Sequence, residues 1–198
     1  MAATASPYGL RPVNLIGGTP FAGSTRQIKI ASGYAANIFN GDVVQIATDG
    51  TVTKVTNVGT NADPFPAGTV GVFVGCAYTD ATYGFTTRQY WPTGTVASDA
   101  VAYIVDDPDA LFMIQADATM AQATLHGNYA VNQTAGSTST GNSAISLDVA
   151  TGATTATIAF KVVDFVNSTT STVGDAYTDV IVKFNPSSHA YLAGLGVA

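Results

Sequence analysis

The chain has 198 residues, of which 46% are apolar and only 10% are charged, and its net charge is −6. The apolar share is enough for a buried core, whereas the charged share is far below the roughly 25% of an ordinary soluble domain. The few Lys and Arg residues are scattered singly on an acidic chain, which excludes a phosphate-binding surface, so we expect no nucleic-acid partner. No apolar run approaches the roughly 18 residues of a membrane span, so we expect no membrane partner either.

The choice of residues predicts an all-β protein. All 13 acidic residues are Asp, and Thr, Val, Gly and Asn are abundant. The lack of Glu and the scarcity of Lys and Arg remove good helix formers, and the residues used instead are typical of short strands joined by tight turns. We therefore predict a β-sandwich or barrel, jelly-roll-like or β-tulip-like, with an extended N-terminal arm and at most one or two short helices.

Residues 1–27 form the predicted arm, which contains "SPYGLRPVNLIGGTPFAGST". This stretch is too rich in large apolar residues for a disordered tail and too broken by Pro and Gly for a core strand. We interpret its large side chains as anchors that contact another subunit: Tyr8, Leu10, Arg11, Val13, Leu15, Ile16 and Phe21. The start of the chain has no basic region followed by an apolar stretch, so we expect synthesis in a cytoplasm without secretion.

Residues 28–117 are predicted to form a first β lobe. Alternating apolar residues begin at Ile28, and Asp49-Gly50 between apolar flanks indicates a hairpin. "TVGVFVGCAYTD" predicts a strand over residues 69–80, in which Gly71 and Gly75 suggest bulges. The break "DDPD" at residues 106–109 indicates a turn between two paired strands.

Residues 118–198 are predicted to form a second lobe with an apolar C-terminal tail. "ATMAQATLHGNYAV" at residues 118–131 is the best helix candidate, with a stop at His126-Gly127. Alternation predicts strands in "TTATIAFKVVDFV" and "DVIVKFNP". The tail "SSHAYLAGLGVA" is expected to dock on its own body or on a neighbour.

No arrangement of reactive residues predicts catalysis, a metal or a cofactor. His126 and His189 stand alone and far apart, unlike metal ligands at close spacing. Cys76 is the single cysteine and lies in a strand-like run, which favours a small core residue over a reactive thiol. The cluster Asp106, Asp107 and Asp109 lacks the further oxygen ligands of a calcium loop and is typical of a solvated turn.

The stretch "YGFTTRQYWP" from Tyr83 to Pro92 gathers aromatic residues around Arg88. Tyr, Trp and Arg are common anchors of protein interfaces, and aromatic rings also cover the apolar faces of sugars. We therefore interpret Arg88 and Trp91 as part of the core or a subunit contact, with a carbohydrate platform as the alternative.

The stretch "GYAANIFNGDVVQIATDGTVTKV…PAGTVGVFVGC" resembles head-decoration, or capsid cement, proteins of tailed bacteriophages, as found beside the major capsid protein in marine and cyanobacterial phages. These proteins often show an apolar-x-x-Gly-Asp-x-Val strand, a hairpin and a Val-Gly-Val strand. The matching residues here are Ile38, Gly41, Asp42, Val43, Val44, Gly71 and Val72. The resemblance implies a non-enzymatic virion protein that binds the major capsid protein on the outer surface of the head, as a homotrimer at three-fold positions, and stabilises the shell against the pressure of packaged DNA.

Two other functions remain open from the sequence. A β-sandwich module for a host receptor or a host-surface glycan would present Tyr90 and Trp91 as an exposed platform. A hydrolase with a β-barrel core would use His126 or His189, although neither lies in a recognisable motif.

Overall fold

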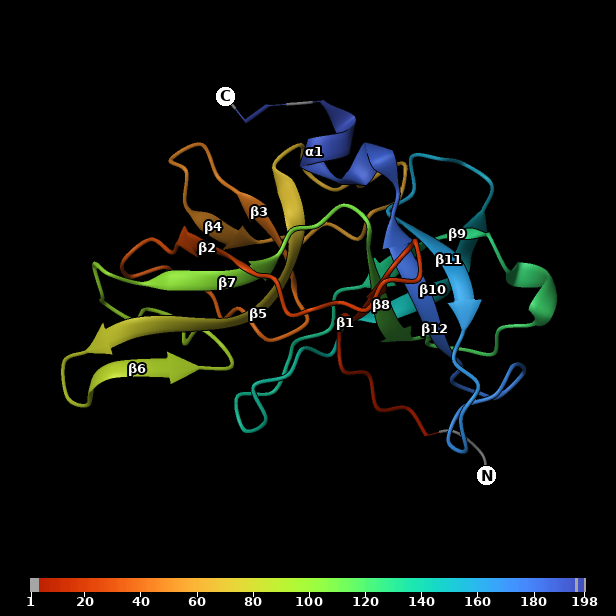
Figure 1. Cartoon of the computed structure of the whole chain (residues 1–198), viewed down its shortest axis with the longest axis horizontal. Helices are drawn as coiled ribbons and strands as arrows, with labels where there is room; N and C mark the ends of the chain where they lie inside the picture. The colour runs from red at the N-terminus through yellow and green to blue at the C-terminus, as the bar shows by residue number, and fades with distance from the viewer. Residues whose placement is uncertain (1–3, 195, 198) are drawn as a thin grey trace.

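The computed structural model describes residues 4–194, 196 and 197. Over these residues the chain forms twelve strands in two antiparallel sheets, with a single short α-helix and two 3₁₀ turns (Figure 1). One buried cluster contains residues of both sheets, so the all-β sandwich predicted from the sequence is confirmed.

The first sheet has the order β2-β7-β5-β3-β4, with β6 paired to the outer part of β5. Its strands are β2 Arg26–Lys29, β3 Val43–Ile46, β4 Val52–Lys54, β5 Thr69–Asp80, β6 Gly84–Arg88 and β7 Val101–Val105. The hairpin predicted at Asp49-Gly50 joins β3 to β4. The predicted bulges are also present, because the pairing of β5 shifts register beside Gly71 and at Gly75.

This first sheet curls around a core of its own. A parallel bridge between Ile30 and Val52 joins the outer strands β2 and β4 at one end. The curl encloses Phe73, Tyr78 and Trp91, and the Tyr78 and Trp91 rings meet edge to face with centroids 5.3 Å apart.

The second sheet has the order β1-β8-β12-β11-β9-β10. Its strands are β1 Arg11–Leu15, β8 Ala110–Gln115, β9 Asn128–Asn132, β10 Ser146–Ala153, β11 Phe160–Phe165 and β12 Asp179–Phe184. The aromatic rings of Phe160 and Phe184 lie 4.5 Å apart at the centre of this sheet's core. Val72 and Val105 of the first sheet belong to the same buried cluster, which therefore joins the two sheets.

The turn at residues 106–109 does not pair the strands on either side of it, so that prediction is wrong. Strand β7 pairs with β2 and β5, whereas β8 pairs with β1 and β12. The turn chemistry is present, since the Asp107 carboxylate accepts the Asp109 N–H at 2.8 Å. The chain changes sheet here, ahead of the lobe boundary expected near residue 117, which stays a prediction.

The helix predicted over residues 118–131 is also wrong. Only Gln122–Thr124 forms a 3₁₀ turn, and β9 begins at Asn128. Tyr129 and Val131 alternate into the core, so strand pairing with β10 and β11 outweighs the helix tolerance of the preceding residues.

The C-terminal tail docks on its own chain. The 3₁₀ turn Pro186–Ser188 leads into α1, Ala190–Ala193, and both lie against the body (Figure 1). His189 is buried, and its ring meets Phe184 at 5.6 Å.

Candidate functional site

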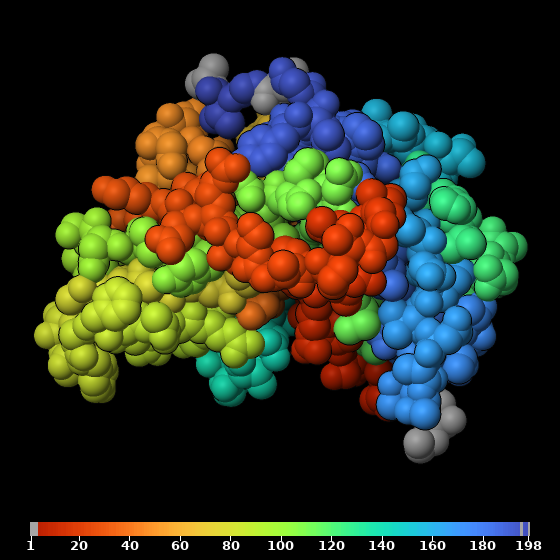
Figure 2. All heavy atoms as spheres, viewed as in Figure 1, coloured from red at the N-terminus to blue at the C-terminus, as the bar shows by residue number. Residues whose placement is uncertain are grey.

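The N-terminal arm is largely part of its own body. Strand β1 pairs with β8 of the same chain, and Leu10 is fully buried in the shared core. In the single chain, Leu10 therefore fills a site in its own core and is not exposed for contact with another protein. Leu15 and Phe21 are partly buried against the same core, and Figure 2 shows the segment that follows β1 crossing the front of the molecule between the sheets.

The other arm residues keep some exposure. Tyr8 and Val13 are half-buried, whereas Arg11 is exposed and Ile16 is 50% exposed. These four remain candidates for contact with a partner.

Trp91 is fully buried, which contradicts its roles as an interface residue and as an exposed sugar platform. Its N–H points to the Tyr34 carbonyl at 3.5 Å, and its backbone pairs with Ile38. Arg88 is half-buried, and its Nε has no partner among the described residues. The aromatic stretch therefore divides between core and surface.

The residues with possible chemistry do not come together. Among residues 4–194, 196 and 197, no group of three His, Cys, Asp or Glu side chains is placed to hold a metal ion. Burial raises the pKa of the Cys76 thiol to about 12, which keeps it protonated. His126 is exposed at a turn. His189 is buried, and its Nε2 has no hydrogen-bond partner among the residues that the structure describes.

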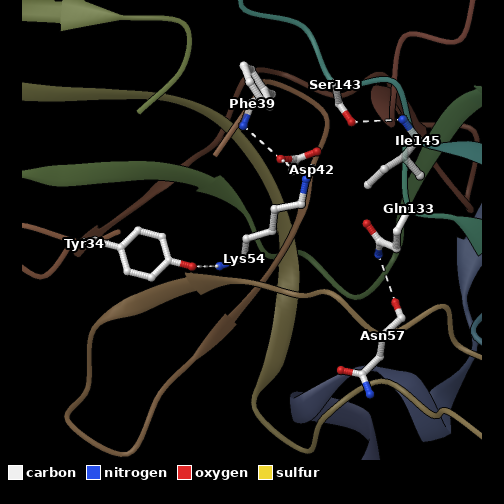
Figure 3. A network of polar contacts seen from close by, with 8 residues as sticks. All are labelled: Tyr34, Phe39, Asp42, Lys54, Asn57, Gln133, Ser143 and Ile145. Atoms are coloured by element: carbon white, nitrogen blue, oxygen red, sulfur yellow. Dashed lines mark hydrogen bonds and ion pairs between the residues drawn. The ribbon is translucent and has the colours of Figure 1, made fainter. Parts of the chain in front are cut away.

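Asp42, whose Gly-Asp sequence carries the family resemblance, lies in a buried polar network (Figure 3). Its Oδ2 accepts the Phe39 N–H at 2.9 Å and lies 2.9 Å from the Lys54 ammonium. The Lys54 backbone N–H in turn donates to the Tyr34 hydroxyl at 3.0 Å. Because Asp42 is 0% exposed, this network holds loops together and offers no access to a substrate.

A groove of about 690 Å³ lies between the N-terminal residues and the loops around residues 135–144 and 170. Tyr8 donates to Asp179 at 3.0 Å, and the Arg11 guanidinium covers the Tyr8 ring at 4.3 Å. Burial raises the pKa of both Tyr8 and Asp179. The ring face covered by Arg11 is not available for stacking on a sugar.

The most prominent surface feature is the β5–β6 hairpin, which projects from the first sheet at the lower left of Figures 1 and 2. Tyr83 and Phe85 on it are 76% and 73% exposed, and Val96 on the adjoining loop is 80% exposed. We call these three side chains the apolar tip.

Side-chain hydrogen bonds fix the backbone of the apolar tip. The Asp80 carboxylate accepts the N–H groups of Thr82 and Tyr83, which holds the pKa of Asp80 below its usual value. Asp99 accepts both the N–H and the hydroxyl of Thr79, which pairs with Phe85, so the loop that contains Val96 is tied to the turn end of the hairpin. The exposed rings therefore sit on an ordered support.

The apolar tip includes two residues of the aromatic stretch from Tyr83 to Pro92, but they are Tyr83 and Phe85 and not the Arg88 and Trp91 that the sequence singled out. The arrangement Asp80-x-x-x-Gly84 is a turn signal that would have placed Tyr83 at a hairpin end. Which residues of β6 point outward depends on how β6 is aligned with β5, and this alignment is not evident from the sequence of the turn.

Comparison with known proteins identified no relative: no family model, no curated protein and no solved structure matches this chain. Within the described residues, none of the helices is long and apolar enough to cross a membrane.

Proposed function

We propose that this chain is a structural virion protein that decorates the outer surface of a tailed-phage head. The proposal joins the sequence resemblance to one structural observation, the apolar tip on an ordered hairpin. Exposed aromatic side chains on an ordered hairpin suit a contact with another protein, because aromatic residues are common anchors of protein interfaces. A protein with so few charged residues gains little from electrostatic attachment, so apolar contact is the mode of binding that suits it.

The proposed contact differs from the arm contact expected from the sequence. Tyr83 and Phe85 are free to enter a pocket of the major capsid protein, whereas Leu10 and Trp91 are used in the chain's own core. Aromatic side chains that become buried in such pockets supply much of the binding free energy at protein interfaces.

The proposed action is stabilisation by preferential binding. A protein that binds the assembled lattice and not the separated subunits shifts the equilibrium toward the lattice. If three copies are joined, as the resemblance implies, their three tips would have to detach together, so modest single contacts suffice. The net charge of −6 suits a position outside the shell, away from the packaged DNA.

The test is binding to heads. DNA-filled heads of a tailed phage that encodes this chain would be stripped of surface proteins and incubated with the purified chain. We expect saturable binding and a higher temperature of DNA release. Failure to bind at saturating concentration, or binding to tail fibres alone, would overturn the proposal.

A variant with Tyr83→Ser and Phe85→Ser should keep its fold and bind heads at least about 30-fold more weakly, because interface aromatics often contribute about 2 kcal/mol or more each. Ile16→Ser is the matched control, since Ile16 is also an exposed apolar residue but lies outside the hairpin. If Ile16→Ser weakens binding and the hairpin variant does not, the head contact lies on the arm instead.

A further inference from the structure

The N-terminal segment, residues 4–15, docks on the body as a separable piece. Within the part of the chain that the structure describes, its strand β1 is an edge strand that pairs with β8, and Asn14 adds a single bridge to Pro20. Leu10 is the one residue of this segment that is fully buried as a large side chain in the core. The segment therefore resembles a bound peptide, held by one ladder and one deep anchor.

The slot that receives this segment is narrow and selective. Gly9 and Leu10 donate their N–H groups to the carbonyls of Ile145 and Gly41, at 3.2 and 3.0 Å. Gly9 has φ +74°, and a Cβ there would lie 2.6 Å from the Ser143 Cβ and 2.8 Å from the Gly41 carbonyl oxygen. The slot accepts glycine followed by a large aliphatic residue, so its fitting occupant is this same segment, from this chain or from another copy.

A side-chain clamp precedes the slot. Gln115 accepts the Ser6 N–H at 2.7 Å and donates to the Thr4 carbonyl at 3.3 Å, as a neighbouring strand would. Tyr8 adds its bond to Asp179. The groove of about 690 Å³ lies along residues 4–8. These residues therefore contact the body mainly through the hydrogen bonds to Gln115 and Asp179.

The linker segment, residues 16–25, connects the docked segment to β2. All of its residues are exposed except the half-buried Phe21. Gly18 and Gly23 meet no heavy atom within 4 Å at the Cβ position, so nothing packs closely over them. The linker contacts the body mainly through Phe21, which packs against the shared core, and through the Ile16 N–H, which donates to the Asp109 carbonyl at 2.9 Å. A different path of the linker would lose these two contacts but would displace no fully buried side chain.

We propose that copies of this chain exchange residues 4–15, so that the segment of one copy fills the slot of another. Exchange of an identical element preserves every docked contact and changes only the linker, which makes it a low-cost route to an oligomer. The inference does not depend on the proposed attachment to phage heads, because it concerns only contacts between copies.

The test uses the β1–β8 register, in which Arg11 faces Met113. An untagged chain with Arg11→Cys and a tagged chain with Met113→Cys would be co-expressed, both with Cys76→Ala, and then oxidised. We expect a disulfide-linked dimer of one tagged and one untagged chain. Residues that pair directly across strands are close enough for a disulfide.

Two controls fix the interpretation. A single chain with both Arg11→Cys and Met113→Cys should form the disulfide within itself or between copies, which shows that the geometry permits the bond. Asp49→Cys replaces Met113→Cys as a control for random collision, because Asp49 lies in an exposed turn of the other sheet. Absence of the mixed dimer while the double variant oxidises, or equal dimer from the Asp49→Cys control, would overturn the exchange and leave head binding unaffected.

Discussion

At the scale of single residues, Asp42 and Lys54 form an ion pair that is almost shielded from water, with side-chain exposures of 0% and 14%. Such a pair contributes little over an apolar substitute, but removal of one partner leaves a buried charge without compensation. The main effect of the pair is therefore to fix the position of the 34–42 loop against β4. Its net contribution to the free energy of unfolding is small by comparison.

Asp42→Ala should lower the free energy of unfolding by about 3–5 kcal/mol, because the Lys54 ammonium and the Phe39 N–H both lose their acceptor. Urea unfolding followed by Trp91 fluorescence measures this. The matched control is Asp109→Ala, since Asp109 pairs with Lys183 at 3.2 Å but is 63% exposed. Its loss should stay below about 1 kcal/mol. Equal losses in the two variants would contradict the assigned role of Asp42.

Gly9 and Gly18 offer a matched pair of substitutions. Both have positive φ, +74° and +79°, but only Gly9 faces atoms that a Cβ would overlap. Gly18→Ala should cost about 1–2 kcal/mol from backbone strain alone. Gly9→Ala should cost about 1–3 kcal/mol more, because the slot cannot accept a methyl group without displacement. Equilibrium unfolding of both variants gives the difference, and equal costs would show that the slot is not tight.

At the scale of elements, the C-terminal tail is held by a cluster around Asp106. Asp106 pairs with Arg26 of β2 at 2.5 Å and accepts the Tyr191 hydroxyl at 2.8 Å. His189 accepts the Tyr191 N–H at 3.3 Å and is itself buried. Burial lowers the pKa of His189, and the positive charge of Lys183 acts in the same direction. Asp106, the Val70 backbone and Asp107 raise this pKa, but their effects are smaller in total.

This environment makes stability depend on pH in a defined direction. The folded pKa of His189 is below its unfolded value, so the unfolded chain binds the proton first as the pH falls. The contribution of neutral His189 to the free energy of unfolding is fully present above about pH 6.5, the pKa of an unperturbed histidine. As the pH falls below that value, this contribution decreases by up to about 1.4 kcal/mol per pH unit until the folded pKa is reached.

His189→Phe keeps a ring against Phe184 and should remove this part of the pH dependence. Urea unfolding of the variant and of the unsubstituted chain at several mildly acidic pH values measures this difference in pH dependence. His126→Gln serves as the control, because His126 is exposed. An unchanged pH dependence in His189→Phe would exclude His189 as its source.

Local signals predicted local elements well. Asp49-Gly50 and the alternation around it predicted the β3–β4 hairpin, because that pairing needs only neighbouring residues. The turn at residues 106–109 has equally good turn chemistry, but its flanking strands pair with distant partners. Turn residues set a chain reversal, whereas the choice of partner strand depends on the whole core.

The arm was misjudged for a related reason. Pro12 argued against a core strand, yet β1 lies at a sheet edge, where a missing N–H is tolerated. The sequence contains no signal that distinguishes an edge on the same chain from an edge on a neighbour. The apolar tip was missed likewise, because exposure of Phe85 and burial of Trp91 follow from register and curl.

At the scale of the whole molecule, the two sheets are joined by a shared core. Val43, Val72 and Val105 of the first sheet lie in one buried cluster with Phe112 and Phe160 of the second. A boundary through such a core exposes apolar surface on both sides, so the sheets should not unfold independently.

We therefore expect one cooperative unfolding transition. Trp91 is the only tryptophan and lies in the first sheet's own core, so its fluorescence reports that sheet, while amide exchange in β12 reports the second. The two probes should give the same free energy of unfolding, because agreement between different probes is a standard test of all-or-none unfolding. Val72→Ala should lower stability by about 2 kcal/mol and shift both probes together, because Val72 is shared between the sheets. Val52→Ala, in the first sheet's own core, is the comparison. It too should shift both probes if the molecule is one unit, whereas a shift of Trp91 fluorescence alone would mean that the sheets form two lobes that unfold separately.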